Sequence, residues 1–283
     1  MGNIRDIKRR IESVTSTRQI TNAMKMVAAS KLRRAQERIV AARPYADYTQ
    51  RMIEKIRKKN RQAIHPFFYP TNKDGKTAFV IVSADRGLCG SFNSEIIRKA
   101  ENYLSENSNV DIICVGKKCY DQIKKNHQIT SEFIGLFNEM RFTASQDISE
   151  LLLDMYLNKT YSKVEILYNE FASVIQQNVV VKTILPIKPS ALESVSLVDF
   201  LYEPDEEQII AELGQKYLAV EIWRMLLESS AAEQAARMTA MDNATENANE
   251  LIEHLSLQYN RERQASITKE ILEIVAGSEA INN

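Results

Sequence analysis

The residues of this chain whose types and spacing could do chemistry gather in one glycine loop, SADRGLCGSFN, at residues 83–93. The loop follows a short apolar run at 77–84 and precedes a stretch of helix-forming residues. Backbone N–H groups at such a strand-to-helix turn attract anions, so a phosphate site is one interpretation. The loop matches neither GxGxxG nor GxxxxGK[ST], and no acidic residue follows about 20 residues later in a ribose-binding role. We therefore predict a tight turn at a strand end and no cofactor.

The cysteines and histidines offer a second chemistry, either metal binding or nucleophilic catalysis. Cys114 and Cys119 are separated by four residues without a second pair, and the three histidines are scattered along the chain. Metal sites need a closer set of ligands than this. Cys89 would need a base and a group that orients the base, and none is identifiable. We expect three buried, reduced thiols, no metal and no catalytic residues.

Charge is segregated along the chain although the formal net charge is zero. Residues 1–60 carry 16 Lys and Arg against 5 Asp and Glu, whereas residues 205–276 carry 6 against 14. Clustered cations neutralise phosphates, so a nucleic-acid-binding coiled coil is one interpretation. Residues 3–40 contain no aromatic residue and no docking motif, which argues against it. The other interpretation is a pair of oppositely charged helices within an assembly.

Two very long helices are predicted at the ends of the chain. Residues 3–43 contain neither Gly nor Pro, and helical composition resumes beyond Pro44 to about residue 60. The 62 residues between Gly214 and Gly277 are also free of Gly and Pro. Helices of this length need another long helix to cover one face, so we predict an antiparallel coiled coil.

The apolar seam of the first helix is predicted to slip along its length. It starts with the 3,4 spacing of a coiled coil at Ile4, Ile7, Ile11 and Val14. Arg18 then falls on the seam, and the apolar stripe moves over by one position to Ile20, Met24 and Val27.

The middle of the chain predicts an inserted α/β domain. Five of the eight glycines lie between Gly75 and Gly135. Apolar strands at 77–84 and 110–116 alternate with helices at 94–105, 117–126 and 145–157, and 163–171 and 174–187 resemble a strand pair. Alternation indicates a parallel sheet with an antiparallel edge. The predicted fold class is therefore α/β: a long antiparallel coiled coil of the N- and C-terminal helices (1–62 and 204–283) with an inserted Rossmann-like α/β domain (75–190).

Three segments together resemble the γ-subunit family of F-type ATP synthases. They are IRDIKRRIESVTSTRQITNAMKMVAASKLRRAQ near the start, SADRGLCGSFN, and AARMTAMDNATENANELI with NRERQASITKEILEIVAG near the end. No transmembrane run, signal peptide or transit peptide is recognisable, so the bacterial form is expected, peripheral at the cytoplasmic face of the cell membrane without direct insertion.

The resemblance implies a central rotor shaft of a proton-translocating ATP synthase. The coiled coil would stand inside a hexamer of α and β subunits, and the α/β domain would lie at its foot with the ε subunit and the c-subunit ring. Catalysis would belong to the β subunits, so the chain would be no enzyme by itself and would bind no nucleotide. As the ring turns, the asymmetric shaft would favour a different conformation in each β subunit.

Partner contacts follow from the same resemblance and from the helix lengths. Met24, Lys25 and Met26 match a segment that lies against a catalytic subunit. Arg263, Gln264 and Thr268 match a segment that meets loops of the catalytic subunits. The basic residues Arg33, Arg34 and Arg38 are expected to face acidic partner surfaces.

The helix lengths place residue i of the first helix beside residue 264 − i of the last. Residues 264–283 would then extend without a partner from this chain. Their apolar side chains, including Ile271 and Val275, predict an enclosing apolar sleeve of partner subunits.

Without the resemblance, two other classes stay open. One is the nucleic-acid-binding coiled coil, which salt-dependent retention on DNA would reveal. The other is a small α/β enzyme with helical arms, which saturable binding of a small ligand would reveal.

Overall fold

The computed structural model describes residues 4–59, 65–70, 72, 74–158, 160–174, 176–188 and 206–282. The predicted ends of the first helix at 62 and of the α/β domain at 190, and the predicted start of the last helix at 204, lie outside the described residues. Among the described helices, none is both long enough and apolar enough to cross a membrane.

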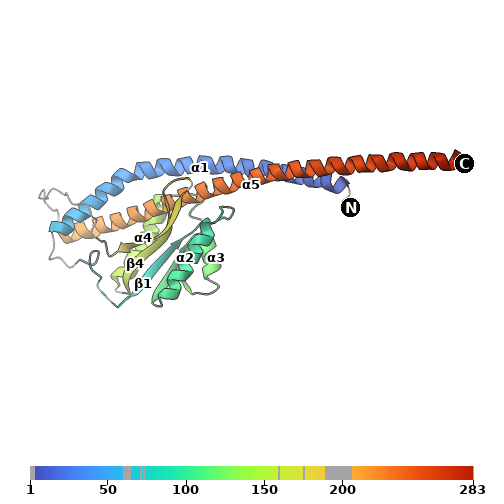
Figure 1. Ribbon diagram of the computed structural model, residues 1–283. Coiled ribbons are helices and arrows are strands. Elements are labelled where there is room, and N and C mark those ends of the chain that lie inside the picture. The colour runs from blue at the N-terminus through green and yellow to red at the C-terminus, as the bar shows by residue number, and fades with distance from the viewer. Residues whose placement is uncertain are drawn as a thin grey trace. The chain divides into compact units, whose positions relative to one another are not determined.

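Two long helices are the main elements, as predicted. Helix α1 spans Ile4–Lys59 and continues through Pro44, and helix α5 spans Glu206–Asn282 (Figure 1). The described chain divides into two compact units. The smaller unit contains residues 1–27 and 238–283, and the larger contains residues 28–237. Each unit therefore contains one part of α1 and one part of α5.

A five-stranded sheet in the larger unit has the order β3-β2-β1-β4-β5. The strands are β1 (Lys76–Val82), β2 (Val110–Val115), β3 (Ile129–Phe133), β4 (Tyr161–Phe171) and β5 (Gln177–Leu185). All neighbours are parallel except β4 and β5, which form an antiparallel edge. The predicted mixed α/β sheet is confirmed.

Apolar layers cover both faces of the sheet because successive strand residues point to opposite sides. On β1, Ala78, Val80 and Val82 belong to a core shared with the larger unit's parts of α1 and α5 and with α4 (Phe142–Leu157). Phe79 and Ile81 belong to the opposite core, with α2 (Phe92–Glu106) and α3 (Lys117–Ile123). Both faces of the central strands are buried, as their continuous apolar runs indicate.

Strand β3 was not predicted from the sequence. Its five residues, ITSEF, alternate between half-buried and exposed positions. It lies at the edge of the sheet, where a strand pairs with a single neighbour and can be stable with only one of its faces covered. With only two strongly apolar residues, the segment lacks the continuous apolar run that identified β1 and β2.

Candidate partner-contact surfaces and the glycine loop

The glycine loop is built around the carboxylate of Asp85, which lies just after the end of β1. This carboxylate accepts backbone N–H bonds from Lys117 (3.0 Å), Gly135 (3.0 Å) and Phe137 (3.3 Å). These donors belong to the start of α3 and to the segment after β3. An α/β fold of this kind offers backbone N–H groups to a phosphate at this end of its strands. Here the chain's own carboxylate accepts them, so the loop is a structural turn.

The glycine loop also binds to α5 inside the larger unit. Arg237 donates from Nη2 to the carbonyl oxygen of Gly87 (3.1 Å) and pairs through Nη1 with Glu233 (2.5 Å). Both charged side chains are almost entirely buried. Burial raises the pKa of Glu233, and the charge of Arg237 opposes that rise. A buried ion pair of this kind fixes the orientation of the loop on the helix.

The cysteines lie in the core as predicted. Cys89, Cys114 and Cys119 are all buried and free. Burial raises the pKa of the Cys89 thiol, which favours its protonated form. His127 pairs instead with Glu101 (2.8 Å), and the ring of His65 stacks on Phe67. Within the described part of the chain, no group of three or more His, Cys, Asp and Glu residues could hold a metal ion.

The seam between α1 and α5 in the smaller unit corrects one prediction. Ile20 and Val27 are 60% and 55% exposed, so the apolar stripe does not shift onto them. Instead the seam keeps its 3,4 spacing through Arg18, Thr21 and Lys25.

Each of these polar seam residues has a partner on α5. Arg18 donates to Asn249 (3.2 Å), the hydroxyls of Thr21 and Thr245 lie 2.8 Å apart, and Lys25 pairs with Asp242 (2.5 Å). Polar residues tolerate seam positions when a partner across the seam satisfies them.

These three pairs also set the register of the coiled coil. Their residue numbers add to 267, 266 and 267, against the predicted 264. The register therefore lies two to three residues further towards the C-terminus than helix length alone indicated. Side-chain pairing across the seam, which helix length ignores, accounts for the difference.

The predicted contact residues on α1 differ in exposure. Met26 is 64% exposed, Met24 is half-buried, and Lys25 is engaged with Asp242 across the seam. Ile20 and Val27, which are seven residues apart and therefore on one face of the helix, are also exposed, and Met26 points about 100° away from them around the helix axis. Exposed apolar groups that gather on one helix mark an interaction surface.

The predicted basic contact residues lie in the larger unit. Arg33 is highly exposed and pairs with Glu37 on the same helix (3.1 Å). Arg34 is also exposed, and it has no acidic partner among the described residues. Successive residues of a helix point in directions about 100° apart, so Arg33 and Arg34 place their charges on different faces of α1.

The predicted contact residues at the end of α5 are all exposed in the smaller unit. Arg263 and Gln264 face solvent, and Thr268 donates its hydroxyl to the carbonyl oxygen of Gln264 (2.9 Å). Ile271 and Val275 are 55% and 49% exposed. With the observed register, Ile4 lies beside residues 262–263, so α5 continues for roughly five turns beyond the start of α1.

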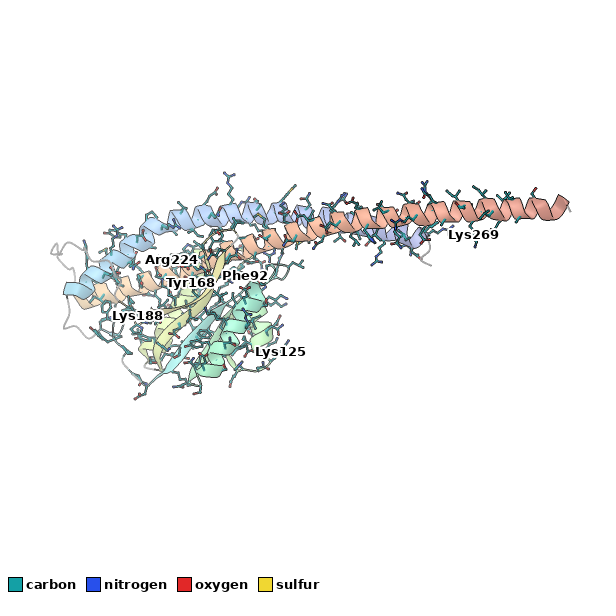
Figure 2. All side chains as sticks on the ribbon, in the orientation of Figure 1. Phe92, Lys125, Tyr168, Lys188, Arg224 and Lys269 are labelled. Carbon is teal, nitrogen blue, oxygen red and sulfur yellow. The ribbon has the colours of Figure 1, made fainter. Side chains whose placement is uncertain are left out.

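A buried charge cluster, which the sequence analysis missed, joins α5 to the sheet within the larger unit. Glu221 on α5 is 2% exposed and pairs with Lys182 of β5 (2.8 Å). Arg224 lies 3.7 Å from Glu221 and 3.5 Å from Glu228. Figure 2 shows Arg224 beside Tyr168 of β4, whose pKa is raised mainly by burial. The available signal was a single charge inside each of two apolar runs, VVVKTIL and LAVEIW.

Comparison with known proteins identifies the family. A family model described as ATP synthase matches residues 3–281. The ATP synthase gamma chain of Chloroherpeton thalassium is 43% identical over an alignment of 300 residues, gaps included, that covers 99% of each chain. That of Salinibacter ruber is 40% identical, again over 99% of each chain.

Solved structures agree with this assignment. A chain of the Tetrahymena thermophila mitochondrial ATP synthase central stalk and c-ring has a TM-score of 0.62 and 27% identity, covering 80% of this chain and 99% of that chain. A chain of the Euglena gracilis mitochondrial ATP synthase rotor has a TM-score of 0.67 at 21% identity, covering 93% and 98%, and shows the shared fold. The chain therefore belongs to the gamma-chain family of F-type ATP synthases, and it is a non-catalytic subunit of the central stalk.

Proposed function

We propose that this chain is the rotating shaft that couples ion flow through a c-subunit ring to ATP synthesis in a hexamer of α and β subunits. The observation that carries the proposal is the end of α5, which continues beyond the start of α1 with large apolar side chains exposed. An isolated helix with that surface in water would be unstable, so it needs a partner. The resemblance to the γ-subunit family implies the partner class, a hexamer of α and β subunits, and similar solved chains come from an ATP synthase central stalk and rotor.

The tip of the shaft is held by an apolar sleeve of α and β subunits. Its exposed apolar side chains are Ile267, Ile271, Leu272, Ile274 and Val275. Apolar contact is non-directional, so it centres an axle without bonds that must break at each angle. Arg263, Gln264 and Thr268 lie just before this tip, where polar side chains meet loops of the catalytic subunits.

A second contact with the catalytic subunits lies on α1. Met26 contributes flexible apolar area to a β subunit, next to the half-buried Met24 and to Lys25, whose ammonium group stays paired with Asp242 of α5. Arg33 and Arg34 face acidic partner surfaces through their exposed guanidinium groups. A shaft biases the three β subunits only if its contacts differ from side to side. The cations and exposed apolar residues of α1 on one side of the shaft, and the excess of acidic residues on α5 on the other, provide that difference.

The α/β domain lies at the foot, with the ε subunit and the c-subunit ring at the cytoplasmic face of the bacterial membrane. Two buried connections fix this domain to α5: Arg237 to the glycine loop, and Glu221 to Lys182 of the sheet. Torque applied at the foot would therefore reach the long helix through hydrogen-bonded charges rather than through a flexible linker.

Assembly tests the proposal. Affinity purification of the tagged chain from solubilised membranes of its own cells should recover α, β, ε and c subunits. The purified chain alone should hydrolyse no ATP, whereas its addition to α and β subunits should produce rotation-coupled turnover. Turnover by the chain alone, or its recovery without α and β subunits, would contradict the proposal.

Hydrogen exchange tests the sleeve separately. Residues 264–276 should exchange fast in the free chain and slowly in the assembled complex. Residues 206–215 of the same helix lie outside the proposed sleeve and provide the internal comparison. Fast exchange of residues 264–276 in both states would show that no sleeve encloses them.

A further inference from the structure

A basic groove lies in the larger unit between α1, the segment that leads into α4, and α5. It encloses about 380 Å³. Its charged lining consists of Lys31, Arg34 and Arg38 from α1 and of Glu139 and Arg141 from the segment before α4. Four cations face one carboxylate, so the groove has a formal charge of +3.

The three cations of α1 form a row along the groove. Residues 31, 34 and 38 are spaced by three and four, which places their side chains on one face of the helix. Seven residues of helix rise by about 10 Å, so the row is longer than a single phosphate or sulfate ion. A ligand that contacts the whole row must carry more than one anionic group.

The charges within the groove are only partly neutralised by the chain itself. Arg141 pairs with Glu139 (2.6 Å), and Arg38 donates to the carbonyl oxygen of Met140 across the groove (3.4 Å). Lys31 lowers the pKa of Glu233, a carboxyl that Arg237 already engages. Arg34 has no acidic partner in the part of the chain that the structure describes. In the free chain its guanidinium group is therefore available to an external anion, and in the assembly an acidic partner surface would compete for it.

The wall opposite α1 adds positive potential to the groove. Arg141 is the N-cap residue of α4, a helix of 16 residues, and its side chain makes no capping bond. The first turn of α4 contains no acidic residue that would offset the helix dipole. The dipole thus acts in the same direction as the four cations.

We propose that this groove binds a compact anion with two or more linked phosphoryl groups, such as pyrophosphate or the diphosphate of a nucleotide. Arginine guanidinium groups bind phosphoryl oxygens in pairs of parallel hydrogen bonds, and two arginines in one row hold two adjacent phosphoryl groups. This binding goes beyond the shaft function, and it departs from the expectation that the chain binds no nucleotide, because the groove would hold the phosphoryl groups alone.

This inference is tested by titrating the full-length chain with pyrophosphate. Calorimetry and ³¹P NMR monitor the binding. Saturable binding of one pyrophosphate per chain is expected, with orthophosphate about tenfold weaker because it reaches fewer cations. ADP should bind as tightly as pyrophosphate if the phosphoryl groups alone are recognised. Absence of saturation, or equal affinity for orthophosphate and pyrophosphate, would overturn the proposal.

Three single variants distinguish specific binding in the groove from general attraction of the anion to a basic helix. Arg34→Gln and Arg38→Gln should each weaken pyrophosphate binding about tenfold. Arg33→Gln removes the same charge from the same helix but lies outside the groove, so it should weaken binding less than about twofold. All three side chains are exposed, so the fold should persist, and circular dichroism would check it. Equal weakening by all three substitutions would overturn the proposal.

Discussion

Lys25 Nζ lies 2.5 Å from Asp242 Oδ1, across a seam position that a coiled coil usually fills with an apolar residue. Thr21 and Thr245 make the next polar layer, one turn towards the N-terminus of α1. Polar layers at seam positions specify register, because any slip leaves them without partners. The two layers therefore fix how the N- and C-terminal helices align in the smaller unit.

A disulfide cross-link should report this register. In the double variant Thr21→Cys with Thr245→Cys, the two sulfurs replace hydroxyls that lie 2.8 Å apart, so oxidation should join them readily. The comparison is Thr21→Cys with Asn243→Cys, which has the register predicted from helix length and should cross-link slowly. Gel mobility with and without reductant measures both. Faster cross-linking of the second pair would contradict the observed register.

Substitution of Asp85 should destabilise the α/β domain. In Asp85→Ala the backbone N–H groups of Lys117, Gly135 and Phe137 lose their shared acceptor, at a cost of about 2–3 kcal/mol in the free energy of unfolding. Asp85→Asn keeps one carbonyl oxygen and should cost about 1 kcal/mol. Urea unfolding followed by circular dichroism gives both values. Two equal losses would mean that the carboxylate charge and its second oxygen are unimportant.

Gly116 should tolerate no side chain. Its φ is +98°, and an added Cβ would lie 2.2 Å from the carbonyl oxygen of Ser83. Gly116→Ala should therefore destabilise the domain by more than about 2 kcal/mol, because strain and a backbone clash act together. Gly277→Ala is the control, since an added Cβ there meets nothing within 4 Å and the residue lies in a helix. Thermal unfolding compares the two, and a tolerated alanine at 116 would contradict the geometry.

Stability should depend on pH through Glu228. Burial raises the pKa of this carboxyl, and Arg224 opposes the rise while Glu170 reinforces it. The folded protein then binds this proton more tightly than the unfolded chain, so the group stabilises the fold at low pH. That contribution is lost as pH rises from the unfolded value of about 4.3 through the raised folded value.

Glu228→Gln removes the titrating carboxyl, so comparison with the parent chain measures its contribution to the pH dependence of stability. The difference in the free energy of unfolding between the variant and the parent chain should shift in favour of the variant as pH rises from about 4 to 7. Glu150→Gln removes an exposed carboxyl of α4 outside this cluster and is the matched control. A difference between Glu228→Gln and the parent chain that is the same at every pH would show that Glu228 titrates equally in the folded and unfolded states.

The sequence alone determined those features of this protein that depend only on residues near one another in the chain. The long intervals without Gly or Pro predicted α1 and α5, and the alternation of apolar strands with helices predicted the parallel sheet and its antiparallel edge. Periodicity and composition record which side of an element is buried, and they do so within a window of a few turns.

Only the tertiary structure decided which distant polar groups meet. The carboxylate of Asp85 could have served a ligand, and its three backbone partners lie 32 to 52 residues away. Arg18 looked like a break in the apolar seam until a partner more than 200 residues away satisfied it, and Thr21 and Lys25 have equally distant partners. Glu221 was one charge in an apolar run until Lys182 of β5 reached it. Local sequence carries no record of such partners, because a polar residue can occupy a buried position wherever the fold brings it a hydrogen bond.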